Sequence, residues 1–248
     1  MFFKYIVLSA IAILASAARI PEPEERIVGG HHIPIEYVPW QVSLLGYANH
    51  FCGGSIYSDR VILTAAHCLV VPIGNLSVRA GSSHWSKGGQ VVKVLKAISH
   101  PKYKKYPHLT YDVAVLILES PLKFSAYVQK IALAEKHSQA GNISFVSGWG
   151  DTRYGAKFGW PILQGVHVAL YDPTVCKNSY GEHVICTDAI GRTICNGDSG
   201  GPLVSLPDRK LIGIVSKGYD CGRLNPGIYA DVVFFRNWFI DTINKNLN

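Results

Sequence analysis

Long apolar runs are missing from this sequence after its first 17 residues, so no later segment is predicted to span a membrane. Residues 1–17 (MFFKYIVLSAIAILASA) combine a lysine near the start with a short apolar run and small residues at Ala15 and Ala17. This combination is typical of a secretory signal peptide, and the run is too short for a comfortable transmembrane helix. We therefore expect a secreted, extracellular protein with no membrane partner.

Charged residues are also scarce. Only 17% of the 248 residues are charged, whereas 48% are hydrophobic and 11% are aromatic. This balance excludes an intrinsically disordered chain and supplies enough apolar side chains for a full core. The length fits one large or two small domains, and neither an internal repeat nor a low-complexity tract is visible.

Acidic residues are absent from one long stretch of the chain. Between Arg60 and Tyr111 there is no aspartate or glutamate, and the formal net charge of the whole chain is +7. The basic residues of this stretch are Arg79, Lys87, Lys93, Lys96, Lys102, Lys104 and Lys105. Because a secreted chain without a recognisable binding module is a poor nucleic-acid binder, we interpret the stretch as a solvated basic face.

The six cysteines lack the paired short spacings of a zinc site. In a secreted chain an even number of cysteines predicts disulfide bonds, and six cysteines allow fifteen connectivities. Two sequons, which begin at Asn75 and Asn142, are candidate surface sites for N-glycosylation.

Helical periodicity is absent until the end of the chain. Short runs rich in valine, isoleucine and aromatic residues recur between turn residues, among them PWQVSLLG, RVILTAAHC, DVAVLILES, ISFVSGWG and GIYADVVFF. Such runs predict strands. In the last segment Phe235, Trp238, Phe239 and Ile243 have helical spacing. The pattern therefore indicates an all-β protein with one C-terminal α-helix.

A glycine-rich stretch, NGDSGGP at residues 196–202, contains the pattern G-x-S-x-G around Ser199. In α/β-hydrolases this pattern marks a nucleophile whose acid and histidine follow it in the chain. No histidine follows His183 here, so that order is excluded. If Ser199 is a nucleophile, its base lies upstream.

Two upstream residues are candidates for the base and its supporting acid. His67 ends an apolar run and precedes Cys68, which could fix it in place. A general base needs such fixing, because proton transfer requires hydrogen-bond geometry. Asp112 begins the most apolar strand candidate and could hold the other imidazole nitrogen. The alternatives are a structural or solvated histidine and an aspartate that only starts a strand or lies in a turn.

In this order, TAAHC, YDVAVL and GDSGGP resemble the chymotrypsin/trypsin family of secreted serine endopeptidases. The resemblance runs from Ile27 to the C-terminal helix and includes RIVGG, PWQVSL, FCGGSI, SGWG, GIVSKG and NPGIY. It implies two packed six-stranded antiparallel β-barrels, with the active site between them and a C-terminal α-helix. The implied division is a signal peptide (1–17), an activation propeptide (18–26) and a protease domain (27–248), whose barrels span 27–128 and 129–248.

The resemblance also implies a role for each site residue. Ser199 is expected to be the nucleophile, His67 the general base and Asp112 the residue that orients the imidazole. The backbone N–H groups of Gly197 and Ser199 are expected to form the oxyanion hole, and Ser216, Lys217 and Gly218 to bind the substrate backbone. The implied disulfide bonds, an invertebrate-like set of three, are Cys52–Cys68, Cys176–Cys186 and Cys195–Cys221.

Activation is expected to follow the short-propeptide zymogen pattern. Cleavage after Arg26 would free the α-amino group of Ile27, which would pair with Asp198. The partners implied are an activating protease that cuts after a basic residue, protein or peptide substrates, and protein inhibitors. A monomer is expected.

The specificity pocket departs most from the trypsin pattern. Thr193 is expected at its base, where trypsin-like enzymes have an aspartate, with Ile194, Gly218 and Gly227 around it. An uncharged, apolar pocket predicts a chymotrypsin-like preference for large apolar or aromatic residues. Elastase-like and, less favoured, trypsin-like preferences stay open, because Ile194 narrows the pocket and Asp220 lies near its rim.

No cofactor or metal is expected. Many relatives bind calcium through acidic residues of a loop in the first barrel, but the corresponding segment from Ala80 to Gln90 has no acidic residue. The rival interpretations are a non-catalytic protease homologue acting as a binding protein, a lipase or esterase on this fold, and a structural matrix protein. The first is disfavoured because the three triad residues are present.

Overall fold

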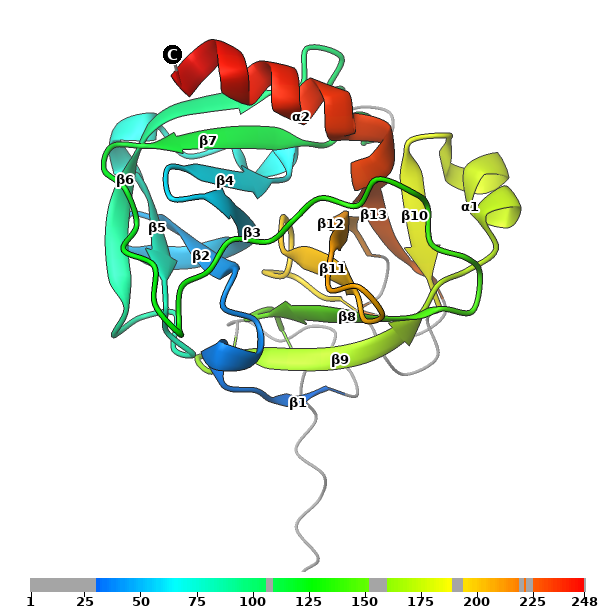
Figure 1. Ribbon diagram of the computed structural model, residues 1–248, viewed down its shortest axis with the longest axis horizontal. Helices are drawn as coiled ribbons and strands as arrows, with labels where there is room; N and C mark the ends of the chain where they lie inside the picture. The colour runs from blue at the N-terminus through cyan, green and yellow to red at the C-terminus, as the bar shows by residue number, and fades with distance from the viewer. Residues whose placement is uncertain are drawn as a thin grey trace, which may run out of the picture.

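The computed structural model describes residues 30–105, 109–151, 160–188, 194–218, 221 and 225–247. It contains two β-units that lie side by side, and the C-terminal helix α2 (Val232–Leu247) runs over the top of both in Figure 1. The expected mostly-β fold with two antiparallel barrel units and a C-terminal helix is confirmed.

The first unit is a closed antiparallel barrel in the order β2-β3-β4-β7-β6-β5. Its strands either alternate apolar and polar residues or are apolar throughout, and their apolar side chains face a shared interior. Short valine-rich and isoleucine-rich segments therefore suffice to build it. The strands are β2 (Gln41–Gly46), β3 (Asn49–Ser58), β4 (Val61–Thr64), β5 (Leu76–Ala80), β6 (Gln90–Ser99) and β7 (Ala114–Leu118). Three short 3-10 helices accompany them: η1 (Ile35–Tyr37), η2 (Ala66–Cys68) and η3 (Ile73–Asn75).

The second unit is a curled sheet whose six main strands follow the order β9-β8-β11-β12-β13-β10. Its two edges meet at a single antiparallel bridge between Leu170 and Thr187. Backbone hydrogen bonds on either side of this bridge link 171 to 186 and 188 to 169, both at 2.9 Å. The strands are β8 (Ile143–Gly148), β9 (Gln164–Ala169), β10 (Val184–Thr187), β11 (Pro202–Ser205), β12 (Leu211–Lys217) and β13 (Gly227–Asp231).

A two-residue strand near the start of the described chain, β1 (His31–His32), pairs with β9 and makes this sheet seven-stranded. The sequence division at residue 128 would place β1 with the first barrel, yet its hydrogen-bonding partner is in the second unit. The register sets His32 opposite Gln164, and Gln164 in turn opposite Gly148 on β8. The start of the described chain is thereby tied to the β9 edge of the second unit, one strand away from β8.

The structure contains a second α-helix, α1 (Pro173–Tyr180), that the periodicity of the sequence did not predict. An eight-residue helix with one fully buried side chain has too short an apolar stripe to show a period. Its ends do carry sequence markers. Asp172 caps the first turn by accepting hydrogen bonds from the backbone N–H of Thr174 at 2.7 Å and of Val175 at 3.3 Å. Pro173 occupies the first turn and Gly181 follows the last.

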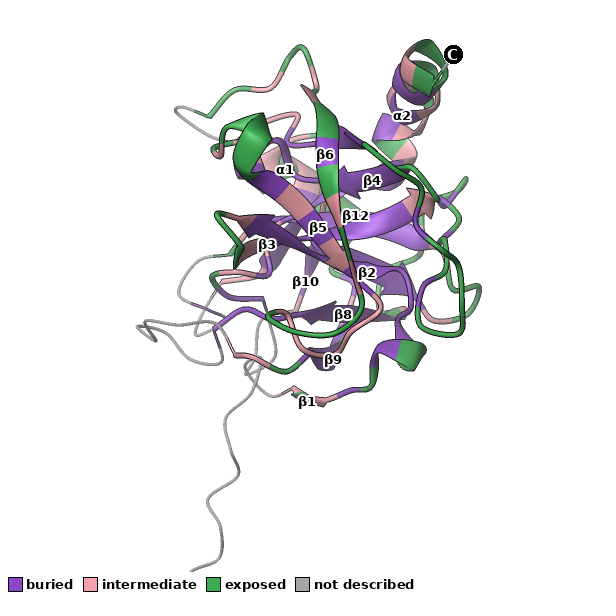
Figure 2. Cartoon of the chain, turned by 90° about the vertical axis from the view of Figure 1, so that its left-hand side faces the viewer, coloured by how far each residue is buried: buried purple, intermediate pink, exposed green. Residues whose placement is uncertain are grey.

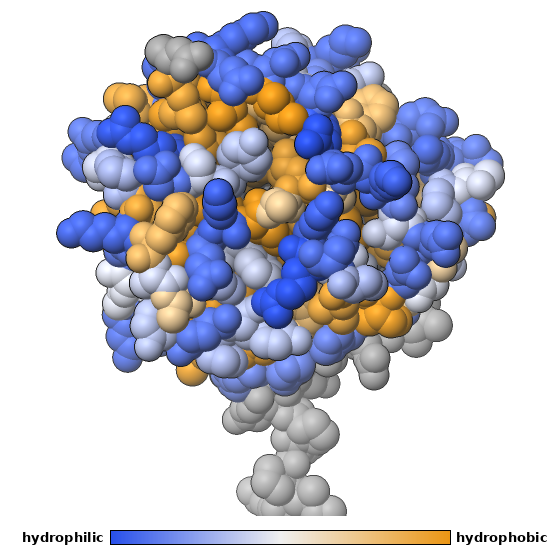
Figure 3. All heavy atoms as spheres, viewed as in Figure 1, coloured by the Kyte–Doolittle hydropathy of each residue, from blue (hydrophilic) through white to orange (hydrophobic). Residues whose placement is uncertain are grey.

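Buried side chains concentrate in the strands and on the inner face of α2, as Figure 2 shows. Phe235, Phe239 and Ile243 of α2 are buried, and they have the helical spacing seen in the sequence. The face seen in Figure 3 mixes hydrophilic and hydrophobic residues. No helix in the described ranges is long and apolar enough to cross a bilayer.

Candidate active site

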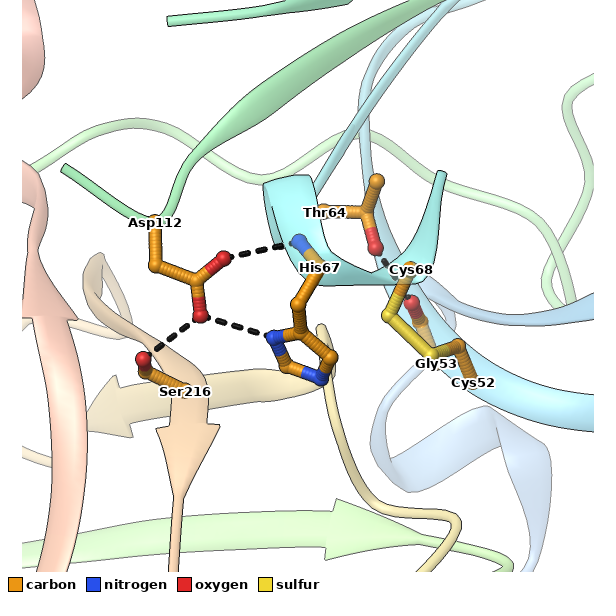
Figure 4. A network of polar contacts seen from close by, with 7 residues as sticks. All are labelled: Cys52, Gly53, Thr64, His67, Cys68, Asp112 and Ser216. Carbon is orange, nitrogen blue, oxygen red and sulfur yellow. Dashed lines mark hydrogen bonds and ion pairs between the residues drawn. A yellow bond between two sulfur atoms is a disulfide. The ribbon is translucent and has the colours of Figure 1, made fainter. Parts of the chain in front are cut away.

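A buried carboxylate, Asp112, is the centre of the candidate site. It lies just before β7, is 2% exposed, and accepts three hydrogen bonds (Figure 4). Its Oδ1 accepts from the backbone N–H of His67 at 2.9 Å, and its Oδ2 accepts from His67 Nδ1 at 2.7 Å and from the Ser216 hydroxyl at 2.6 Å. Because a carboxylate can only accept, Nδ1 carries the imidazole proton and Nε2 is left as a base.

The position of His67 is fixed by three elements. Strand β4 leads directly into η2, which carries His67, and the Cys52–Cys68 disulfide ties η2 to β3. The Thr64 hydroxyl donates to the Gly53 carbonyl at 2.8 Å and holds the same two strands together. The His67 side chain is 19% exposed, so it can reach a substrate while its Nδ1 side stays buried.

Ser199 lies on a loop that packs against this part of the first barrel. The backbone N–H of Gly53 donates to the Ser199 carbonyl at 2.7 Å. Gly200 has φ +77°, and a side chain there would collide with Thr64 Oγ1. The loop therefore approaches the segment that precedes His67 closely, although in the described chain no hydrogen bond joins the Ser199 hydroxyl to His67. Such catalytic bonds are often long without substrate.

Two backbone N–H groups of this loop have no hydrogen-bond acceptor among the described residues. In the part of the chain that the structure describes, the N–H groups of Gly197 and Ser199 donate to no acceptor. Gly197 has φ +96°, which favours glycine. Its carbonyl is held from the other side by His50, whose Nε2 lies 3.0 Å from that oxygen.

His50 is a site residue that the sequence analysis missed. Burial lowers the pKa of His50 to about 4, so the ring is neutral at pH 7. A carbonyl can only accept, so Nε2 carries the proton and donates to Gly197, while Nδ1 accepts from the Ser43 hydroxyl at 2.8 Å. The one local marker of this role is the position of His50 two residues before Cys52.

Asp198 is a second buried carboxylate, and it lies beneath the Ser199 loop. It accepts from the backbone N–H of Gly150 at 2.8 Å and of Cys195 at 3.0 Å. A side chain at Gly148 or Gly150 would overlap the carboxylate, so both glycines leave space for it. Burial is the main cause that raises the pKa of Asp198 to about 7. Among the described residues no cation lies within ion-pair distance of it.

A cavity opens beside Ser199 between the ends of β12 and the segment after residue 193. Its lining residues are Ile194, Cys195, Asn196, Ser199, Val215, Ser216, Lys217, Gly218 and Cys221. Two of the expected pocket residues therefore meet here, since a Cβ on Gly218 would lie 3.2 Å from Ile194 Cγ1. Gly227 lies against Thr187 and Tyr229 and is not part of this lining. Thr193 and Asp220 lie outside the described residues.

The three disulfide bonds join Cys52 to Cys68, Cys176 to Cys186 and Cys195 to Cys221. Cys176–Cys186 ties α1 to β10, and Cys195–Cys221 forms part of the cavity wall. Atoms of Cys52, Cys68 and His67 lie within 4.8 Å of one another. The two sulfurs are bonded to each other, so they offer no thiolate to a metal. The activation residues Arg26 and Ile27 lie outside the described residues.

The loop from Ala80 to Gln90 is organised around the guanidinium of Arg79. The Arg79 guanidinium donates to the carbonyl of Gly88 and to that of Ser86, the latter at 3.4 Å. The Ser82 hydroxyl lies 2.7 Å from the Lys87 carbonyl and also accepts from the backbone N–H of His84 at 2.9 Å. Carbonyl groups that could face a metal ion are thus turned towards a guanidinium.

Comparisons with known proteins agree with this geometry. The family model described as Trypsin matches residues 27–239. The chain is 42% identical to Trypsin alpha of Drosophila erecta, with 98% of this chain and 99% of the relative covered. It is 42% identical to Trypsin beta of the same species, with 96% and 98% covered. It is 41% identical to Trypsin alpha of Drosophila melanogaster, with 98% and 99% covered.

The Arg79 arrangement predicts that calcium does not affect stability. The melting temperature of the protein should be the same with calcium and with a chelator, whereas Arg79→Met should cost about 1–2 kcal/mol by removing charge-assisted bonds. Lys87→Met removes a charge from the exposed part of the same loop and is the matched control, expected to change little. A large calcium-dependent rise in melting temperature would refute the prediction.

Asp198 should make the uncut chain less stable as the pH rises. Its folded pKa of about 7 is higher than its ordinary value of 3.8, so the stability it contributes is present below pH 4 and is lost as the pH rises through 7. In the uncut chain, the free energy of unfolding of Asp198→Asn relative to that of the parent should therefore rise between pH 4 and pH 8. The rise should be on the order of 4 kcal/mol at most.

This difference can be measured by urea unfolding of both chains in a Ser199→Ala background, which prevents self-cleavage. His50 has a pKa lowered by burial, and its contribution has the opposite slope, but it is common to both chains and cancels. A difference in unfolding free energy between the two chains that stays constant across this pH range would contradict the prediction.

Proposed function

The chain belongs to the trypsin family of serine endopeptidases, and from this premise we propose that it hydrolyses peptide bonds through Ser199, His67 and Asp112. The observation that carries the proposal is the bonding of Asp112, which holds His67 by both its backbone and its ring. This bonding fixes the imidazole in one tautomer and leaves Nε2 to take a proton. A binding protein would have no need of it.

In the proposed reaction, the Ser199 hydroxyl oxygen attacks the substrate carbonyl carbon, and His67 Nε2 takes the hydroxyl proton. The Asp112 carboxylate stabilises the imidazolium that forms, at a separation of 2.7 Å. The N–H groups of Gly197 and Ser199 bind the oxyanion. His67 then returns the proton to the leaving amine, and water releases the acyl group by the same steps.

The substrate backbone is proposed to extend the second sheet. Strand β11 pairs with β12 only as far as Ile214, and the N–H and carbonyl of Val215 bond to residues 201 and 200. Beyond this point Ser216, Lys217 and Gly218 pass Ser199 along the cavity. An extended peptide laid against them as an added strand would bring its carbonyl to the Ser199 loop.

Activation is proposed to require cleavage between Arg26 and Ile27. The freed ammonium of Ile27 would supply the cation that Asp198 lacks among its described neighbours. Pairing there would stabilise the loop that carries the N–H groups of Gly197 and Ser199. Gly148, which leaves space for the Asp198 carboxylate, lies on β8, and only β9 separates β8 from β1. The distance is thus two strand spacings of about 4.8 Å each, which the short segment after Ile27 can span.

Specificity is proposed to be chymotrypsin-like. Ile194 is buried and apolar at the cavity wall, and the sequence supplies Thr193, without charge, for the base. A lysine or arginine would then be buried without a counterion, which is unfavourable. The matched relatives carry the name trypsin, so cleavage after basic residues is the competing outcome.

The processing and the localisation of the chain are proposed from the same premise. Residues 1–17 would be removed on secretion and residues 18–26 on activation, giving an extracellular monomer under the control of protein inhibitors. Asn75 is exposed and suits a glycan, whereas Asn142 is half-buried just before β8. No cofactor is proposed.

Cleavage of the purified chain between Arg26 and Ile27 should switch on hydrolysis of peptides. Ser199→Ala, cleaved in the same way, should lose on the order of 10⁴-fold or more in kcat, because the triad acts as a unit. Arg26→Gln should resist cleavage and stay inactive. An uncut chain or an alanine variant that works at the rate of the cleaved enzyme would overturn the assignment.

A peptide library should show the cleaved enzyme cutting mainly after Phe, Tyr, Leu or Met. Thr193→Asp should shift cutting towards Lys and Arg by supplying the missing counterion. Dominant cutting after Lys or Arg by the parent enzyme would reject the chymotrypsin-like preference. Dominant cutting after Ala or Val would show instead that Ile194 closes the pocket.

A further inference from the structure

We infer that Lys217 selects substrates with an acidic side chain at the second or fourth position before the scissile bond, an inference that rests on the proposed peptidase function. Lys217 lines the same cavity as Ser199 and follows Ser216, which bonds to Asp112. It is thus a cation placed directly on the proposed path of the substrate.

A β-bulge at the end of β12 sets the direction of the Lys217 side chain. Val215 pairs with Tyr229 and Lys217 pairs with Ile228, so Ser216 is an additional residue on this strand. A bulge redirects the side chains beside it. Here it turns the Ser216 hydroxyl to Asp112 and leaves Lys217 at the point where β12 meets the cavity.

The Lys217 ammonium lies in a half-buried environment. Its Nζ is 5.9 Å from the ring centre of Tyr180, at the end of α1. Burial lowers the pKa of Lys217, and the Asp112 carboxylate acts in the opposite direction. No ion pair between described residues includes Lys217. The ammonium has therefore lost part of its water without gaining a bonded anion in that part of the chain.

The geometry of an extended strand decides which substrate residues meet this cation. Side chains of an extended peptide alternate between its two faces. The residue before the scissile bond enters the cavity between Ile194 and Gly218, and the third residue points to that same face. The second and fourth residues point to the other face. The proposal places the Lys217 ammonium on this other face, because it lies within electrostatic reach of Asp112, which holds His67, and against Tyr180.

A carboxylate at one of these positions would give the ammonium the partner it lacks. A charge-assisted hydrogen bond in a partly desolvated groove is stronger than one on an open surface. A basic side chain at the same positions would be repelled by Lys217. The sequence signal for this preference is the lysine itself, a cation within the segment that is expected to bind the substrate backbone.

The test uses cleaved enzyme and peptide pairs that differ only in Glu against Gln at the second, third or fourth position before the bond. We expect kcat/KM to favour Glu by about fivefold at the second or fourth position and to be nearly equal at the third. The preference should shrink at high salt, because ions still screen a charge pair that is only partly buried. Lys217→Arg should keep the preference, and Lys217→Met should abolish it.

Comparing Glu with Gln within one variant separates selectivity from any general loss of activity. Lys177→Met is the matched control, because it removes the same charge from nearby α1, where Lys177 pairs with Glu182 at 3.3 Å. It should leave the ratio unchanged. Equal rates for Glu and Gln peptides, or a preference that survives in Lys217→Met, would overturn the inference while leaving the peptidase intact. Failure to cut any peptide would instead reject the function on which it rests.

Discussion

The site depends on one buried carboxylate whose hydrogen-bond donors come from both halves of the molecule. Asp112 receives two bonds from His67 in the first barrel and one from Ser216 in the second unit. A buried carboxylate without donors would be strongly unfavourable, so these three bonds favour the arrangement in which both units reach Asp112. The position of the imidazole and the relative placement of the two β-units are therefore set by the same interaction.

The close approach of the Ser199 loop completes this join. Gly53 and Gly200 lack side chains where the two units touch, and the Gly53 N–H to Ser199 carbonyl bond crosses between them. Polar groups of the first barrel are thereby paired with groups of the second unit. The helix α2 adds a further link, since it packs on β7 of the first barrel as well as on β12 and β13.

Sequence patterns predicted the features that depend on residues close together in the chain. The strand runs, the helix near Phe235 and the three short segments around His67, Asp112 and Ser199 are each readable within about ten residues, which is the range of periodicity and motif spacing. Features that depend on distant partners were not readable. His50 acquires its role only because Gly197 lies above it, and β1 joins β9 across more than 130 positions of sequence. Helix α1 was missed although Asp172, Pro173 and Gly181 mark its ends.

The pairing of β1 with β9 has a consequence for how a freed amino group would find Asp198. A terminus beginning at Ile27 would be anchored four residues later, at His31, to the strand beside the one that carries Gly148. Four residues reach about 14 Å, so the ammonium would explore only a small volume around the carboxylate. Its effective concentration there would be in the millimolar range or higher, as for any short tether. The pairing would then be insensitive to dilution of the protein and hard to displace with free amines.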